Sequence, residues 1–184
     1  MAARVTARRR AAALLVLAAI VAGCGGRPSV DRPATFPPGT FGPGDPTGPA
    51  VAATRAELAR ALGAVSLQLA DPQVPHRPGE SPLLATAPRA VFQVVLPDDP
   101  AHGFVSVYEF ADEAAATAAG RDQAAYIASG PGRVQFVPDS RFVIRQLGPT
   151  VVFFAWSPMN ALDPRAAEIQ KVLETIGTGI PVPS

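Results

Sequence analysis

The amino-acid sequence predicts an α+β domain, in which an antiparallel sheet of five to six strands packs against two or three helices on one face. Two observations lead to this prediction. Several segments alternate apolar and polar residues, as half-buried strands do, and follow one another across short turns. An alanine-rich segment and the C-terminal segment instead carry apolar residues at helical spacing. Paired strands with helices between them are typical of α+β layer folds.

The domain is predicted to begin with a short helix. The pattern Thr54-x-x-Glu57 is a capping box, and the apolar residues after it lead to a helix end near Gly63. Residues 65–69 alternate in polarity and predict a weak first strand. The proline-broken stretch 71–81 is predicted to be a loop.

A β-hairpin is predicted next. Its strands cover 90–96 and 104–110, and the turn sequence PDDPAHG separates them. Side chains of a strand alternate between its two faces. The second strand therefore divides into one face with Phe104, Ser106, Tyr108 and Phe110 and another with Val105, Val107 and Glu109.

An alanine-rich helix is predicted to follow the hairpin. Asp112 is its expected N-cap, and the helix should end near Ser129, before Gly130-Pro131-Gly132. One stripe at a period of 3.6 residues carries Ala116, Gly120, Ala124 and Ile127. Small side chains on this stripe would let the helix lie close to the sheet.

Three strands and a final helix complete the predicted domain. The strands cover 133–137, 141–147 and 151–156, and the last is apolar on both faces, which predicts a central place in the sheet. Asp163 and Pro164 are expected to begin the final helix. Its predicted buried stripe is Ile169, Val172, Leu173 and Ile176.

The N-terminal region has the layout of an export signal. Residues 1–10 contain four arginines and no acidic residue, and residues 11–22 are all apolar. A transmembrane helix needs about 20 apolar residues, so this segment is too short for a permanent span. We expect it to be cleaved.

Val21, Ala22, Gly23 and Cys24 resemble the bacterial lipobox, in which a cysteine is diacylated before the signal peptidase cuts on its N-terminal side. The resemblance implies a lipid anchor on Cys24 and a place at the cell membrane, on its extracytoplasmic face. Cys24 is the only cysteine, so the exported chain would have no disulfide. A core cysteine is implausible between glycines and prolines, and no histidine or acid is near enough in sequence to activate a reactive thiol.

The predicted organisation is a signal peptide over 1–23, a lipidated Cys24 with a tether up to residue 50, and one α+β domain over 51–184. Proline and glycine make up half of residues 25–50, a composition that cannot bury enough apolar area to order itself. Removing the signal takes four of the 16 basic residues and leaves 15 acidic ones, so the net charge becomes −3. A mildly acidic chain without a basic cluster argues against a nucleic-acid partner.

Two long runs in the domain resemble small secreted or lipid-anchored bacterial domains. They are FVSVYEFADEAAATAA over 104–119 and RFVIRQLGPTVVFFAW over 141–156. That group has no assigned chemistry, so the resemblance implies a fold and supplies no catalytic residue or cofactor.

One candidate for chemistry lies in the predicted hairpin turn, where Asp98, Asp99 and His102 could form a metal or acid–base cluster. A solvated turn is the simpler interpretation. The sequence has no HExxH, CxxC or GxSxG motif and no paired-histidine spacing, so we predict no metal site, no cofactor and no catalytic residue. Tyr108, Phe154 and Trp156 could line a groove, but aromatic residues on strands are usually core.

These observations predict a lipid-anchored binding or accessory module at the cell envelope, with a protein or a small molecule as its ligand. The alternatives are an envelope enzyme of the hydrolase type that uses Asp98, Asp99 and His102, or a structural part of envelope assembly. A cleft that joins these residues to a hydroxyl would favour the enzyme. An aromatic-lined cavity of a few hundred Å³ would favour a small ligand.

Overall fold

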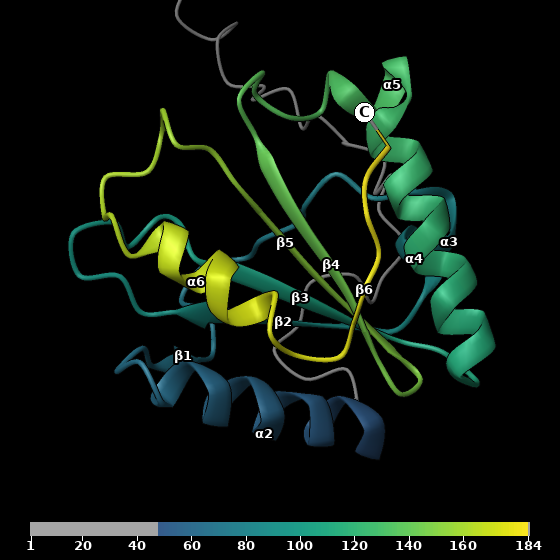
Figure 1. Cartoon of the computed structure of the whole chain (residues 1–184), viewed down its shortest axis with the longest axis horizontal. Helices are drawn as coiled ribbons and strands as arrows, with labels where there is room; N and C mark the ends of the chain where they lie inside the picture. The colour runs from purple at the N-terminus through teal and green to yellow at the C-terminus, as the bar shows by residue number, and fades with distance from the viewer. Residues whose placement is uncertain (1–47, 184) are drawn as a thin grey trace, which may run out of the picture. The chain divides into compact units, whose positions relative to one another are not determined.

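A computed structural model describes residues 48–183. The predicted signal peptide, its Val21-Ala22-Gly23 motif, Cys24 and nearly all of the tether lie outside the described residues. The described part contains one antiparallel sheet with strand order β1-β2-β3-β5-β4-β6 (Figure 1). Its strands are β1 (Leu69–Ala70), β2 (Arg89–Val94), β3 (Phe104–Glu109), β4 (Arg141–Leu147), β5 (Thr150–Trp156) and β6 (Thr178–Gly179). Its helices are α2 (Pro49–Gly63), α3 (Pro82–Thr86), α4 (Glu113–Ala128), α5 (Gly130–Arg133) and α6 (Ala166–Leu173).

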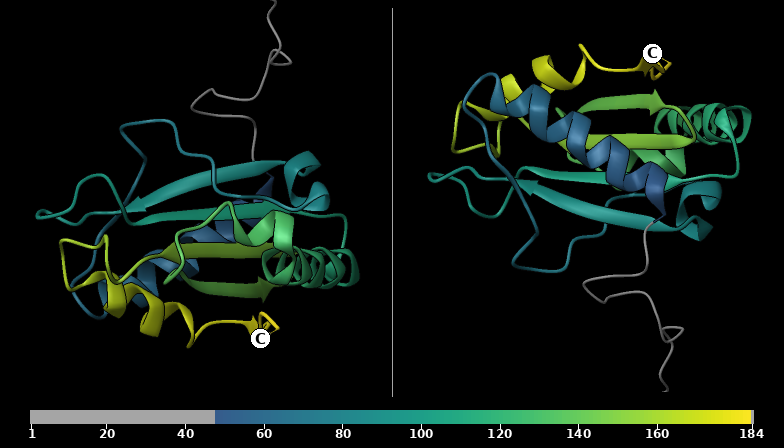
Figure 2. Two further views of the ribbon diagram at one scale, coloured as in Figure 1. Left: turned by 90° about the horizontal axis from the view of Figure 1, so that it is seen from above. Right: turned by 90° about the horizontal axis from the view of Figure 1, so that it is seen from below.

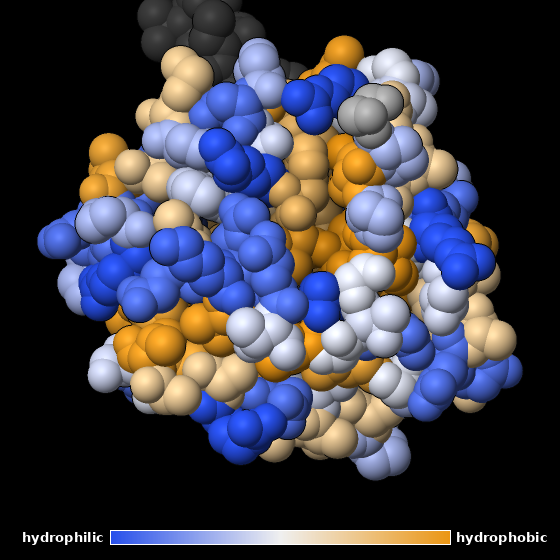
Figure 3. All heavy atoms as spheres, in the orientation of Figure 1, coloured by the Kyte–Doolittle hydropathy of each residue, from blue (hydrophilic) through white to orange (hydrophobic). Residues whose placement is uncertain are grey.

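The α+β fold class is confirmed, and so is the predicted hairpin of β2 and β3, which forms the centre of the sheet together with the hairpin of β4 and β5. β2 pairs with β3 in a register that places Val91 opposite Ser106. β4 pairs with β5, which in turn pairs with β3, so β5 occupies the central place predicted for it. At the edge, β6 pairs only with Arg145 and Gln146 of β4. Hydrophobic residues reach the surface over β4, beside the hydrophilic surface of α6 (Figure 3).

The helices cover both faces of the sheet, so the predicted packing on one face is wrong. α2 and α6 pack on the first face, where α2 crosses behind the strands seen from above and in front of them seen from below (Figure 2). α4 and α3 pack on the second face. The reason is visible in β5, because Val152 and Phe154 point to the first face and Val151 and Phe153 to the second. A strand that is apolar on both sides needs cover on both sides.

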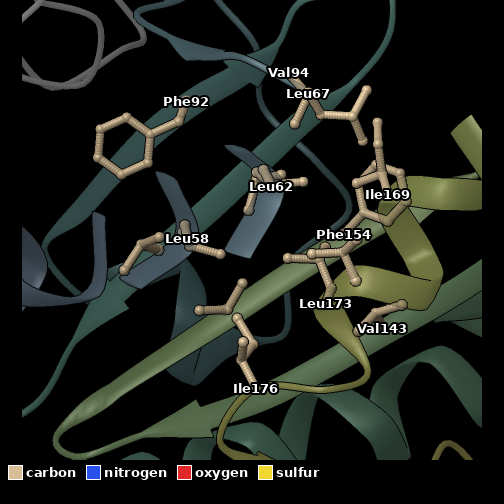
Figure 4. Close-up of a cluster of buried hydrophobic side chains, with 14 of the residues drawn as sticks. Leu58, Leu62, Leu67, Phe92, Val94, Val143, Phe154, Ile169, Leu173 and Ile176 are labelled. Atoms are coloured by element: carbon tan, nitrogen blue, oxygen red, sulfur yellow. The ribbon is translucent and has the colours of Figure 1, made fainter. Parts of the chain in front are cut away.

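The first-face core joins α2 and α6 to each other and to the sheet. Leu58 and Leu62 of α2 meet Ile169 and Leu173 of α6 across strand residues such as Phe154 (Figure 4). The predicted buried stripe is confirmed, since Ile169, Val172 and Leu173 of α6 and Ile176 beyond its end are all buried. These contacts remove large apolar side chains from water, which is the main favourable term in folding. The predicted start at Asp163 and Pro164 is wrong, because α6 begins at Ala166.

The second-face core depends on the small-residue stripe of α4. Ala116, Gly120, Ala124 and Ile127 are buried as predicted, and Asp112 caps the helix by accepting a hydrogen bond from Ala115 N at 2.8 Å. A Cβ atom on Gly120 would collide with Ile180 of the C-terminal tail, although the contact is with the end of a flexible side chain. The small residue therefore leaves room for that tail.

The predicted capping box at Thr54 is wrong. α2 begins five residues earlier, at Pro49, and so includes the last two residues assigned to the tether. Proline is favoured at the first helical position because its missing N–H needs no partner there. Thr54 instead lies inside the helix and faces the core.

Residues 133–137 were expected to form a strand, which is also wrong. Ser129 caps the short helix α5 by accepting from Gly132 N at 3.2 Å, with Pro131 in its first turn, and a loop follows. The free edge of β4 is taken by β6 from the C-terminal end of the chain. The predicted first strand, 65–69, is mostly wrong, because the observed strand β1 is Leu69–Ala70 and shares only Leu69 with it. Ser66 adopts a left-handed φ of 61°, which a strand residue does not have.

Candidate functional site

A cleft of about 270 Å³ opens on the second face of the sheet. Its floor consists of Ser106, Phe153 and Ala155, which are second-face positions of β3 and β5. Two chain segments form its walls, residues 76–79 and residues 135–137 together with Ser140. His102, Ser157 and Asn160 line its end.

The first wall belongs to a strap, residues 76–81, that is held to the sheet through a buried carboxylate. The side chain of Glu80 is only 2% exposed, and it accepts hydrogen bonds from Arg77 Nε at 2.9 Å and Tyr108 Oη at 2.8 Å. It also forms an ion pair with Arg89. Burial, reinforced by the negative charge of Glu80, raises the pKa of Tyr108, so its hydroxyl remains a donor.

A second set of contacts fixes the strap to α4. Gln123 is fully buried, and its amide accepts from Ser81 N at 2.7 Å and donates to Gly79 O at 2.9 Å. Gly79 is required by space, because a Cβ atom there would lie 2.8 Å from Cζ of Phe136. The strap therefore has a defined path between the helix and the cleft.

Aromatic rings shape the interior of the cleft. His76 stacks on Phe104 with ring centroids 4.2 Å apart and planes 6° apart. Phe136 meets Phe142 edge to face at 4.8 Å and Phe153 at 6.4 Å. Burial lowers the pKa of His76, and the charge of Arg89 lowers it further, so the stacked imidazole is neutral at neutral pH.

Two aspartates hold the loop 157–162 at the end of the cleft. Asp99 Oδ2 accepts from Leu162 N at 3.0 Å, and Asp139 accepts from Ser157 Oγ at 2.7 Å and Met159 N at 2.8 Å. The burial of Asp99 would raise its pKa, but its hydrogen bonds with His102 and Leu162 N outweigh burial, so its pKa lies below the ordinary value. Both carboxylates are thus committed to shaping the loop.

The structure brings together two members of the predicted cluster. His102 Nδ1 lies 2.5 Å from Asp99 Oδ1, and the imidazole lines the cleft. Asp98 is exposed and is not part of the lining. Among residues 48–183 no group of three or more histidine, cysteine, aspartate or glutamate side chains could hold a metal ion.

The three aromatic residues considered for a groove divide between core and cleft. Tyr108 and Phe154 are buried in the second-face and first-face cores. Trp156 lies at the margin of the cleft, and its indole N–H donates to Gln170 of α6 at 2.7 Å. The ring-bearing walls at His76 and Phe136 were missed, because no motif marks either residue and both come from loops.

Only one residue of the lining carries a fixed charge. Arg77 is a cation, and the remaining polar lining consists of two histidines, three serines, a glutamine and an asparagine. The site can therefore offer ring contacts, hydrogen bonds and one guanidinium to a small molecule.

Comparison of the chain with family models, with curated proteins and with solved structures found no match. No helix among residues 48–183 is both long enough and apolar enough to cross a membrane. The site must therefore be interpreted from its own geometry.

Proposed function

We propose that this protein is a lipid-anchored extracytoplasmic binding protein whose domain holds a small molecule in the cleft. The observation that carries the proposal is the aromatic lining of a cleft of about 270 Å³. Ligand sites in proteins are concave, mostly apolar and equipped with a few polar groups, and this volume is slightly below the lower end of their usual range. The anchor and the location rest on the resemblance of residues 21–24 to a lipobox.

Binding is favoured over catalysis by the state of the polar groups. A nucleophilic hydroxyl needs a base within hydrogen-bond reach. Within the described residues, Ser157 donates to Asp139, and no hydroxyl group is hydrogen-bonded to His102. The groups around the cleft support its shape and are not arranged as a nucleophile and its base.

A fragment screen by NMR tests the proposal. Ser140→Phe fills the cleft from a partly exposed wall position, and Ala118→Phe adds the same bulk to the exposed side of α4 as a control. We expect fragments that bind the parent protein to be lost from Ser140→Phe and retained by Ala118→Phe. Fragments that bind all three proteins alike, or no binding to the parent, would contradict a cleft ligand.

A hydrolase is the second candidate, and a single observation favours it. The buried carboxylate of Asp99 orients His102 through Nδ1, which leaves Nε2 as a potential base at the cleft. Hydrolysis of a panel of ester and amide substrates tests this alternative. If the parent protein hydrolyses a substrate and His102→Gln does not, the function of the cleft is catalysis and not binding.

A further inference from the structure

From the lining of the cleft we infer that its ligand joins an aromatic ring to an anionic group such as a carboxylate. The ring lies against Phe136, and the anion meets the guanidinium of Arg77. This inference rests on the proposed binding function and adds the chemical class of the ligand.

The walls and floor favour a flat ring. Phe136 meets the floor residue Phe153 at 79°, and the stacked pair of His76 and Phe104 also lines the cleft. Aromatic rings prefer edge-to-face or offset neighbours, which an inserted ring would find at Phe136 and at the His76–Phe104 pair. A bulky aliphatic group would fill the same space without these contacts.

The charge beside the cleft favours an anion. Glu80 is one carboxylate shared by two guanidiniums, Arg77 and Arg89, which leaves one net positive charge in the group. Arg89 is the more buried cation, at 14% exposed, whereas Arg77 is 39% exposed. The bond from Arg77 to Glu80 uses Nε, so its terminal amino groups can meet a carboxylate of the ligand.

The other carboxylates near the cleft do not oppose an anion directly. Asp99 and Asp139 are not among the lining residues, and both accept hydrogen bonds from the loop 157–162. The positive charge of Arg141 also stabilises the negative charge of Asp139. Of the residues that line the cleft, none is acidic.

A second cavity places Arg77 at a junction. This cavity, of about 350 Å³, shares Arg77, Pro78, Gly79 and Gln135 with the cleft and adds Glu80 and Tyr126 to its lining. The guanidinium therefore lies where the aromatic space meets a more polar space. A ligand whose ring lies in the cleft could therefore place an attached anionic group against the guanidinium of Arg77.

Isothermal titration calorimetry measures binding in this experiment, because the indole of Trp156 packs against the first-face core and donates to Gln170 of α6, away from the second-face cleft. We would titrate the full-length protein, purified in detergent, with four probes and record the heat of binding. Phenylacetate carries the ring and the carboxylate, phenylacetamide and phenethylamine replace the anion by a neutral and a cationic group, and cyclohexylacetate replaces the ring. We expect phenylacetate to bind at least about fivefold more tightly than each of the others.

Variants at Arg77 identify the source of the preference. Arg77→Gln should weaken phenylacetate binding about fivefold or more and leave phenylacetamide unchanged, and Arg77→Lys should retain part of the preference. Arg60→Gln, an exposed site on α2, is the matched control and should change neither probe. Circular dichroism checks that each variant is folded.

Two results would overturn the inference while leaving the proposed function intact. One is equal or tighter binding of the neutral, cationic or aliphatic probe. The other is a carboxylate preference that survives in Arg77→Gln. If instead no fragment and no probe depends on an open cleft, as judged with Ser140→Phe, the binding function itself fails and the inference fails with it.

Discussion

The hydroxyl groups of Thr54 and Thr150 lie 2.8 Å apart in the buried contact between α2 and β5. Thr150 also donates its proton to Leu147 O at 2.8 Å. Because a hydroxyl has one proton, Thr54 must be the donor in the pair and Thr150 the acceptor. This short relay is a polar link within the otherwise apolar first-face core.

The direction of the relay predicts unequal costs. Thr150→Val leaves the buried hydroxyl of Thr54 without its acceptor and should lower the free energy of unfolding by about 1–3 kcal/mol. Thr54→Val should cost less, because Thr150 keeps its bond to Leu147 O, and the double variant should recover part of the loss. Urea unfolding of the variants measures these values, with the exposed Thr86→Val as the control. Equal costs for the two single variants would contradict the assigned direction.

The stripe of small residues on α4 gives a second prediction. Ala124 is 3% exposed and packs in the second-face core, whereas Ala118 faces solvent on the same helix. Ala124→Leu should overpack this contact and cost about 1–3 kcal/mol, and Ala118→Leu should change stability by less than about 0.5 kcal/mol. Chemical denaturation of both variants tests the placement. Similar effects at the two positions would mean that the helix is rotated.

Much of the fold could be predicted because local pattern and tertiary packing agree in its central elements. The strand 141–147 is predicted with the bounds that the structure has, and the cap at Asp112 is observed. The strand 151–156 was recognised as apolar on both sides, and this observation already implied helices on both faces. The prediction that the helices lie on one face overlooked this consequence.

The elements that were missed depend on distant parts of the chain. β6 forms because the C-terminal tail reaches the edge of β4. No local sequence pattern predicts this contact. The cleft is harder still, since its walls come from the strap and from residues 135–137 together with Ser140, which meet only after folding. Of the predicted cluster, Asp99 and His102 meet because they lie three residues apart in one turn.

The stability of the domain should fall in acid through Asp163. Hydrogen bonds from the Arg165 side chain and from Arg165 N lower the pKa of Asp163 from its ordinary value of 3.8 to about 2. A carboxyl whose pKa is lower in the folded state stabilises the fold above its unfolded pKa, and this contribution is lost as the pH falls toward the folded value. We therefore expect Asp163→Asn to be less stable than the parent at neutral pH and to lose less stability between about pH 4 and pH 2.

Urea unfolding at a series of pH values measures this difference. Asp71→Asn is the control, because Asp71 forms an exposed ion pair with Arg55 and the change should hardly alter the pH profile. Parallel profiles for the parent and Asp163→Asn would show that Asp163 does not contribute in this range.

The final prediction concerns the anchor on Cys24. One acyl chain gives only marginal membrane binding, whereas two or three hold a protein durably, so the lipidated chain should remain on membranes through a high-salt wash. After cleavage the chain would be mildly acidic and would lack a basic cluster that could bind a lipid surface electrostatically. The acyl chains would then be the main source of membrane affinity.

The variant Cys24→Ala separates the contribution of the lipid to membrane binding from every other contribution. In a two-phase detergent extraction the parent should enter the detergent phase, and Cys24→Ala, produced without residues 1–23, should enter the aqueous phase. Labelled fatty acid should be incorporated into the parent and be absent from the variant, because Cys24 is the only cysteine. Mass spectrometry should find an acylated Cys24 at the N-terminus of the parent. A parent that takes up no label and begins at another residue would refute the lipoprotein assignment, and the cleft would then belong to a secreted or signal-anchored protein.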